Sequence, residues 1–168
     1  MRRIVWAAAA AAAIGLALGG VSLASGGPAN SGNPMVIHLI SRATAINNFV
    51  DTGPPGFSPG DIYVFSDRLF LASTPDTQLG TIDGRCVLID PAAFRFDCSN
   101  TAHIPQGEPL DAGDIMSSGT LTLAEGTTST IAIVGGTGPY RTARGDVTIQ
   151  LGPFEGPHES TVNLILNP

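Results

Sequence analysis

Eight short runs of β-type residues, separated by turn residues, constrain the fold of this chain more than any other feature. They lie at about 36–45, 61–71, 78–89, 94–103, 115–125, 129–135, 143–151 and 159–166. Several runs alternate with period two, so that Val147, Ile149 and Leu151 share one face of theirs. Beyond the N-terminal segment, no stretch has the periodicity of a helix. The pattern predicts an all-β domain.

Eight strands of similar length with hairpin-like connections predict a closed eight-stranded antiparallel β-barrel, because closure leaves no strand edge exposed. A β-sandwich is the alternative, and it would lack an enclosed lumen. The run 61–71 is apolar on both faces, with Tyr63 and Phe65 on one side and Ile62 on the other. Such a strand fits between a lumen and another subunit or a covering segment. The segment 49–60 holds three prolines and three glycines, which predict a loop.

The N-terminal segment has the features of an export signal. An arginine pair at positions 2–3 precedes an uncharged apolar stretch, which ends in small residues suited to cleavage after Ala24. We predict a signal peptide over 1–24, a flexible tether over 25–34 and a barrel domain over 35–168. The apolar stretch is also long enough to span a bilayer, so an uncleaved anchor is the alternative. We expect a secreted protein with no stable membrane insertion after signal cleavage.

Charge and composition narrow the class of partner. The chain has 14 acidic and 8 basic residues, a net charge of −6, and every basic residue is arginine. Because nucleic-acid binding requires a basic patch, scattered arginines in an acidic chain predict no nucleic-acid partner. Hydrophobic residues make up 43% of the chain and charged residues 13%, which favours a folded domain over a disordered one.

The two cysteines, Cys86 and Cys98, are predicted to form a disulfide. A turn over 90–93 that places Asp90 opposite Phe94 would bring the cysteines face to face on a hairpin, at a separation that a disulfide can bridge. Export to an oxidising compartment favours this bond, and two buried thiols are the alternative. The chain has no Cys-x-x-Cys motif and few histidines, so we expect no metal site and no cofactor.

The most specific motif lies at residues 133–147 and reads Ile-Val-Gly-Gly-Thr-Gly-Pro-Tyr-Arg-Thr-Ala-Arg-Gly-Asp-Val. It combines a strand, a glycine-rich turn and a second strand. A phosphate-binding loop is excluded, because the chain has no lysine and Arg141 occupies a position where a dinucleotide fingerprint requires glycine. The motif resembles the Gly-Gly-Thr-Gly-x-Tyr/Phe-x-x-Ala-Arg-Gly signature of dirigent proteins. It is also similar to the Gly-Gly-Ala-Gly stretch of plant allene oxide cyclases.

Two further segments are similar to the same superfamily. Residues 60–70, Gly-Asp-Ile-Tyr-Val-Phe-Ser-Asp-Arg-Leu-Phe, resemble its Gly-Asp-x-x-x-Phe-x-Asn/Asp-x-Leu strand, and residues 84–89, Gly-Arg-Cys-Val-Leu-Ile, resemble its Gly-x-Cys-Val strand. The matches follow the family's order over roughly residues 60–151. The chain is therefore similar to an exported, bacterial-type member of the dirigent and allene oxide cyclase barrels. The resemblance implies an eight-stranded barrel with an apolar lumen, often assembled as a homotrimer.

The resemblance also supplies two candidate catalytic residues, Asp67 and Arg144. Asp67 matches an asparagine of the cyclases, and Arg144 matches the signature arginine of dirigent proteins. A carboxyl group in an aromatic-lined cavity is suited to proton transfer, and an arginine can orient an anionic or carbonyl oxygen with a forked hydrogen bond. Two structural roles are the alternatives. Asp67 would then cap its strand and pair with Arg68 or another arginine, and Arg144 would hold the glycine-rich turn.

Tyr63, Phe65 and Leu69 are the candidate ligand-binding residues, because they share a strand face with Asp67. Packing in an ordinary core is the alternative role for these side chains. Allene oxide cyclisation itself is not expected. Residues 35–50 lack the glutamate and proline of the cyclase site, and a disulfide would consume the thiol that matches the cyclase cysteine.

The predicted function follows from the resemblance and from this sparse set of polar residues. Dirigent proteins direct the coupling or cyclisation of a reactive intermediate that is generated elsewhere. We expect an exported barrel that binds a hydrophobic small molecule in its lumen and steers ring closure or coupling, an isomerase-like or cyclase-like activity. Proximity and exclusion of water supply much of such catalysis. The alternative is a non-catalytic barrel, either a lipocalin-like carrier or a structural protein.

Overall fold

The structure, a computed structural model, describes residues 34–45, 47–105, 110–152 and 159–167. Its strands are β1 (Met35–Arg42), β2 (Asn48–Val50), β3 (Ile62–Leu71), β4 (Thr74–Asp90), β5 (Arg95–Ile104), β6 (Gly113–Thr122), β7 (Thr128–Gly136), β8 (Arg144–Leu151) and β9 (Glu159–Asn167). A 3-10 turn, η1 (Gly138–Tyr140), precedes β8. The predicted signal peptide lies outside the described residues, as does all but the last residue of the predicted tether. Within the described ranges, no helix is long and apolar enough to cross a membrane.

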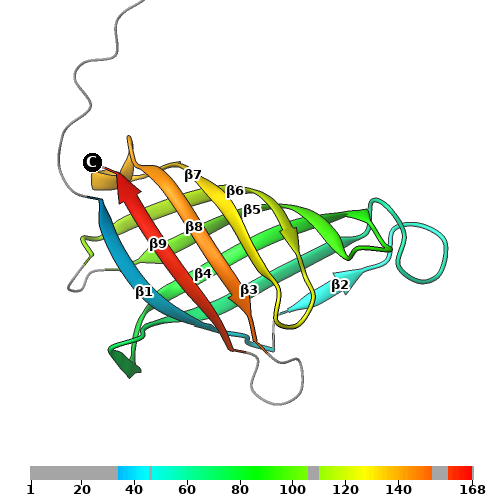
Figure 1. The fold of residues 1–168 in the computed structure, drawn as a ribbon, viewed down its shortest axis with the longest axis horizontal. Coiled ribbons are helices and arrows are strands. Elements are labelled where there is room, and N and C mark those ends of the chain that lie inside the picture. The colour runs from blue at the N-terminus through cyan, green and yellow to red at the C-terminus, as the bar shows by residue number, and fades with distance from the viewer. Residues whose placement is uncertain (1–33, 46, 106–109, 153–158, 168) are drawn as a thin grey trace, which may run out of the picture.

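The strands form a closed antiparallel barrel. Hydrogen bonding follows the order β1-β9-β8-β7-β6-β5-β4-β3, and β1 also pairs with β3, which closes the ring (Figure 1). The closing ladder joins residues 39–42 of β1 to residues 68–71 of β3. The short strand β2 pairs with the beginning of β3, outside the closed ring. The prediction of a closed eight-stranded barrel is therefore confirmed, and the sandwich is excluded.

Several strand boundaries differ from the sequence prediction, and two of these differences have a structural reason. The segment 49–60 was expected to be a loop throughout, but its first two residues belong to β2. The fourth strand begins at Thr74, whereas its predicted run begins at 78. Pro75 and Asp76 have low strand propensity, so the sequence gives no signal for a strand at these positions. The β3–β4 ladder tolerates these residues because its register shifts twice, after Leu69 and after Phe70.

The Cys86–Cys98 disulfide is present, as predicted, and joins β4 to β5. The turn at the end of this hairpin differs from the prediction. Asp90 pairs with Arg95 rather than with Phe94, because Ile89 on β4 has no partner in the ladder and shifts the register by one residue. Phe94 lies in the turn and adopts a φ of 47°. The extra residue is absorbed before the cysteines are reached, so their opposition is preserved.

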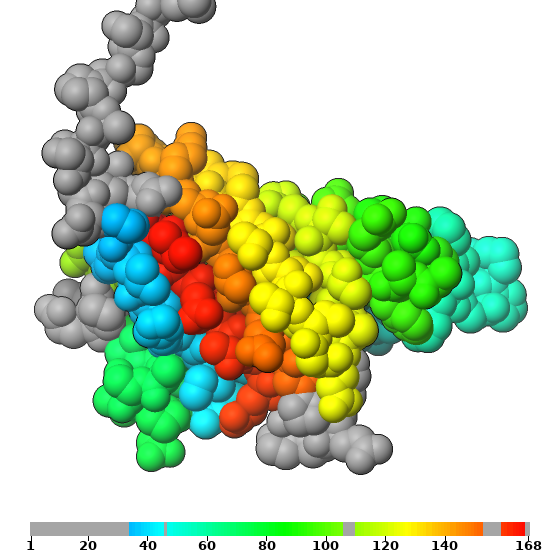
Figure 2. Space-filling model, viewed as in Figure 1, coloured from blue at the N-terminus to red at the C-terminus, as the bar shows by residue number. Residues whose placement is uncertain are grey.

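The interior of the barrel is filled at one end and hollow at the other. The filled end is the end where β1 begins and β9 finishes. Its buried apolar side chains include Ile37, Leu39, Leu69, Ile104, Ile115, Ile133, Leu164 and Leu166. At the opposite end, the segment 51–61 and the β4–β5 turn project together beyond the barrel (Figure 2). The cavity described below opens at this projecting end.

Candidate functional site

A cavity of about 600 Å³ occupies the hollow end of the barrel. Most of its wall is apolar and comes from inward-facing positions of six strands. These apolar wall residues include Ile82, Phe96, Leu121, Ile149, Leu151 and Val162. A volume of this size accommodates a small organic molecule and buries most of its surface.

Three aromatic rings form the rim of the cavity. The Phe57 ring meets the Phe49 ring edge-on, with centroids 4.9 Å apart, and meets the Phe94 ring in the same manner at 5.1 Å. Edge-to-face contacts of this kind are favourable beyond the area that they bury. Phe57 still exposes 56% of its surface, so the rim presents an apolar edge to solvent.

The buried carboxylate of Asp61 fixes the segment that carries Phe57. It accepts hydrogen bonds from the backbone N–H of Thr52 at 2.9 Å and from that of Ser58 at 2.6 Å, and the Ser58 hydroxyl also donates to it. These backbone hydrogen bonds lower the pKa of Asp61, with smaller contributions from the two hydroxyl groups. The backbone of Asp61 also pairs with Leu88 on β4. The 51–61 segment is thus tied to the barrel wall.

Asp67 projects from β3 into the cavity, and two neutral side chains hold its carboxylate. Ser41 Oγ on β1 donates to Asp67 Oδ2 at 2.9 Å, and Asn47 Nδ2 donates to Oδ1 at 3.0 Å. The Asn47 amide is itself oriented, because its oxygen accepts the Ser66 N–H. Among the described residues, no ion pair joins Asp67 to an arginine. The alternative of a surface ion pair with Arg68 therefore receives no support.

Tyr63 and Phe65 form an aromatic wall beside Asp67. Their rings are stacked with centroids 5.7 Å apart and an interplanar angle of 24°. Burial raises the pKa of the Tyr63 phenol, the negative charge of Asp67 raises it further, and a hydrogen bond with Asn47 acts in the opposite direction. The phenol therefore keeps its proton at neutral pH and remains a hydrogen-bond donor.

Asn100 on β5 contributes an amide group to the cavity wall. Its side chain is buried, and neither its amide nitrogen nor its amide oxygen has a hydrogen-bond partner among the described residues. Phe65, Gly84 and Asn100 lie opposite one another on β3, β4 and β5. A Cβ atom at Gly84 would overlap both the Phe65 ring and the Asn100 amide oxygen. The missing side chain therefore lets the ring and the amide approach each other.

Two of the predicted site residues lie elsewhere. Leu69 is 1% exposed and belongs to the filled end of the barrel, so it does not line the cavity. Arg144 is exposed and donates to the backbone oxygens of Val134 at 3.0 Å and Ala143 at 2.7 Å. This geometry matches the alternative role of Arg144, which is to hold the glycine-rich turn. The structure thus brings together Tyr63, Phe65 and Asp67 but not the other two.

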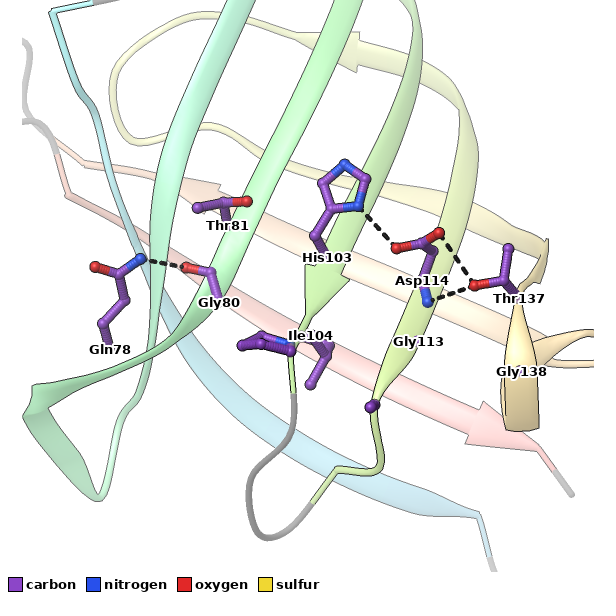
Figure 3. A pocket seen from close by; sticks show the side chains of 11 residues that line it. Gln78, Gly80, Thr81, His103, Ile104, Gly113, Asp114, Thr137 and Gly138 are labelled. Atoms are coloured by element: carbon purple, nitrogen blue, oxygen red, sulfur yellow. Dashed lines mark hydrogen bonds and ion pairs between the residues drawn. The ribbon is translucent and has the colours of Figure 1, made fainter.

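A second pocket, at the filled end of the barrel, is lined by the polar side chains of His103, Asp114 and Thr137 (Figure 3). The His103 ring lies between two carboxylates, with Nδ1 2.7 Å from Asp114 Oδ1 and Nε2 3.1 Å from Asp83 Oδ2. Thr137 Oγ1 donates to Asp114 at 3.0 Å. The hydrogen bond with His103, and then the one from Thr137, lower the pKa of Asp114. In the described parts of the chain, no cluster of side chains is suited to hold a metal ion.

The polar cavity residues that were not predicted from the sequence include Ser41, Asn47 and Asn100. Ser41 and Asn100 lie on strand faces that are otherwise apolar, and Asn100 is two positions beyond Cys98 on the same face. Period-two alternation alone would therefore have identified both. Asn47 precedes β2 in a connecting segment, where no periodicity specifies the direction of a side chain.

The fold and the cavity define an antiparallel barrel whose hollow end can enclose a small molecule. Residues 42–164 match the family described as "Allene oxide cyclase barrel like domain", and the chain belongs to this family. The resemblance to dirigent proteins and allene oxide cyclases is thereby confirmed. No curated protein sequence matches the chain.

Several solved structures share the barrel. The chain is 26% identical to a pyocyanin demethylase, with a TM-score of 0.61, over 78% of this chain and 99% of that one. It is 19% identical to the pterocarpan synthase dirigent protein PsPTS1, with a TM-score of 0.66, over 80% and 95% of the two chains. It is 18% identical to the Diels-Alderase AbmU from Streptomyces koyangensis, with a TM-score of 0.61, over 79% and 63%. The last two likenesses establish the common fold alone.

Proposed function

We propose that this protein binds a hydrophobic small molecule in the barrel cavity and steers the cyclisation or coupling of a reactive intermediate outside the cytoplasm. One observation carries the proposal: a single carboxylate, Asp67, is held by neutral donors in the wall of a largely apolar cavity of about 600 Å³. The Cys86–Cys98 disulfide is compatible with an oxidising compartment.

The apolar residues of the cavity would set the shape of the bound molecule, and Asp67 would supply charge. The apolar walls restrict a flexible molecule to few conformations and keep water from the reacting atoms. Asp67 uses two of its lone-pair positions for Ser41 and Asn47, so the others are available to accept a proton or to stabilise a positive charge that develops as a ring closes. Tyr63 offers a protonated phenol that can donate to an oxygen of the bound molecule.

The names of proteins with the same barrel support this class of chemistry. The dirigent protein named above is described as a pterocarpan synthase, and AbmU is described as a Diels-Alderase. A Diels-Alder reaction forms a ring, and both proteins share the fold of this chain. The homotrimer implied by the resemblance stays a prediction, which light scattering of the purified protein would test.

The test of binding uses native mass spectrometry of the protein after incubation with an extract of its own culture. We expect a bound small molecule on the native protein. Replacing Ile149, a wall residue, by tryptophan should fill the cavity and abolish the adduct. Replacing Val134, which is exposed on β7, by tryptophan serves as the matched control and should leave the adduct unchanged. An adduct of equal intensity on Ile149→Trp would place binding outside the cavity.

The test of chemistry compares Asp67→Asn with Asp146→Asn, a matched change at an exposed position of β8. We expect Asp67→Asn to retain the bound molecule while it slows product formation at least about tenfold or alters product stereochemistry. The Asp146 variant should behave as the native protein does. Equal rate and stereochemistry in both variants would remove Asp67 from the mechanism.

One observation favours a lipocalin-like carrier as the second candidate. The family's signature arginine, Arg144, binds backbone oxygens of the turn and supplies no charge to the cavity. A carrier would return its bound molecule chemically unchanged, and it would do so equally from the native protein and from Asp67→Asn. Mass spectra of the released molecule before and after incubation distinguish the two functions.

A further inference from the structure

The Asn100 amide is the one polar group of the cavity wall that the fold leaves unsatisfied among the described residues. The residue is 3% exposed, and both polar atoms of its side chain lack partners. A buried amide without hydrogen bonds is costly, because it has left water and gained nothing in exchange. The residues next to Asn100 give no structural reason for a buried amide, because Gly84 has no side chain and Phe65 presents an aromatic ring.

We propose that Asn100 is a specificity-determining residue whose amide pairs with a bound molecule that carries a hydrogen-bond donor next to an acceptor on a flat ring, as in an aromatic lactam. An asparagine amide presents an acceptor oxygen and a donor nitrogen side by side. A lactam presents the complementary pair in one plane, so two hydrogen bonds form together. This inference rests on the proposed binding function and adds the substrate class.

The surroundings of Asn100 fit a flat ring. The stacked rings of Tyr63 and Phe65 form a continuous aromatic surface, and because Gly84 has no side chain, the Phe65 ring lies next to the amide. A planar molecule can therefore stack on the aromatic wall while its edge meets the amide. Because the amide atoms expose almost no surface, the ligand displaces neighbouring side chains as it reaches them, a change of rotamer that binding commonly brings.

Asn100 and Asp67 then have separate roles. Both line the cavity, but the carboxylate is already hydrogen-bonded to Ser41 and Asn47, whereas the amide has no protein partner. A site built to satisfy a polar group discriminates strongly against analogues that lack the matching atoms. Asn100 therefore selects the molecule, and Asp67 acts on it.

Three probes of similar size test the inference by calorimetry. They are 2-quinolone, which has an N–H beside a carbonyl; N-methyl-2-quinolone, which lacks the donor; and naphthalene, which lacks both. We expect the native protein to bind 2-quinolone about tenfold more tightly than its N-methyl derivative. In Asn100→Leu this preference should disappear, and Asn100→Ala provides a second variant with the same expectation. Ser117→Ala, a buried polar change next to Asn100 that does not line the cavity, should keep it.

The ligand-free proteins give a second readout. Because leucine removes an unsatisfied amide, Asn100→Leu should raise the Tm by about 3 °C or more while it loses the preference. A variant that gains stability and loses recognition identifies a binding role that a purely structural residue would not show. An unchanged preference in Asn100→Leu, or equal affinity of the native protein for both quinolones, would overturn the inference. If naphthalene still binds, the proposed cavity function survives that result; if no probe binds, both fail.

Discussion

The Cys86–Cys98 disulfide closes a short loop at the end of the β4–β5 hairpin, and its removal is a quantitative test of what stabilises this barrel. The cysteines are separated by 12 positions in the sequence. A cross-link around a loop of this size lowers the entropy of the unfolded chain enough to stabilise the fold by about 3 kcal/mol. Both side chains are buried, so the double variant Cys86→Ala/Cys98→Ala removes the cross-link without placing a new polar group in the core.

For a domain of this size, a loss of about 3 kcal/mol lowers the Tm by about 10 °C. Thermal unfolding followed by circular dichroism measures this shift, and urea unfolding measures the accompanying m-value. We expect the m-value to rise, because the unfolded chain without a cross-link exposes more surface. Native protein treated with a reductant should show the same fall in Tm. Ser99→Ala, an exposed change beside Cys98, is the matched control and should leave both quantities unchanged.

A Tm within about 3 °C of the native value in both the double variant and the reduced protein would contradict the expected stabilisation. That result would show that strand pairing and side-chain packing hold the hairpin without help from the covalent bond. An unchanged m-value together with a large fall in Tm would place the effect in the folded state. The lost packing of the two sulfur atoms would then be its cause.

Three further predictions follow from the site. Gly84→Ala should destabilise the protein by about 1–3 kcal/mol in urea unfolding, because its Cβ would overlap the Phe65 ring, and Phe65→Leu should relieve part of this loss; equal effects in the single and double variants would contradict the overlap. Because the pKa of Asp61 is lowered in the folded protein, its carboxylate stabilises the fold above the ordinary pKa of 3.8, and this stabilisation is lost as the pH falls through the lower folded pKa. Asp61→Asn should therefore weaken the fall in stability at acid pH, and an unaltered fall would exclude Asp61 as its cause. Arg144→Ala should cost about 1 kcal/mol or less and leave small-molecule binding unchanged, whereas lost binding would return Arg144 to the site.

The strands and the cysteine pair could be predicted because each rests on local order. Period-two alternation identifies a strand face, and a short turn between two strands sets their register, which is why Cys86 was correctly placed opposite Cys98. The wrong partner predicted for Asp90 did not disturb this result, because the register shift at Ile89 lies between the turn and the cysteine pair.

The candidate site was only partly predictable, because alternation gives the face of a residue but not its depth. Phe65, Asp67 and Leu69 share one face of β3, yet the first two line the cavity and the third is packed in the filled end. The boundary between hollow and filled interior depends on side chains from all the strands together. Arg144 illustrates a second limit, because a motif gives a residue's position along the chain but not the atoms that its side chain will bind.

The hydrogen bond between Ser41 and Asp67 crosses the seam where β1 meets β3, the contact that turns an open sheet into a ring. The two partners come from opposite margins of that sheet, so the carboxylate gains this donor only when the circle is complete. A chain whose first strand has detached would keep the aromatic wall of Tyr63 and Phe65, but Asp67 would have lost the hydrogen bond from Ser41. In the proposed function, Asp67 therefore has its full set of hydrogen-bond donors only in the closed barrel.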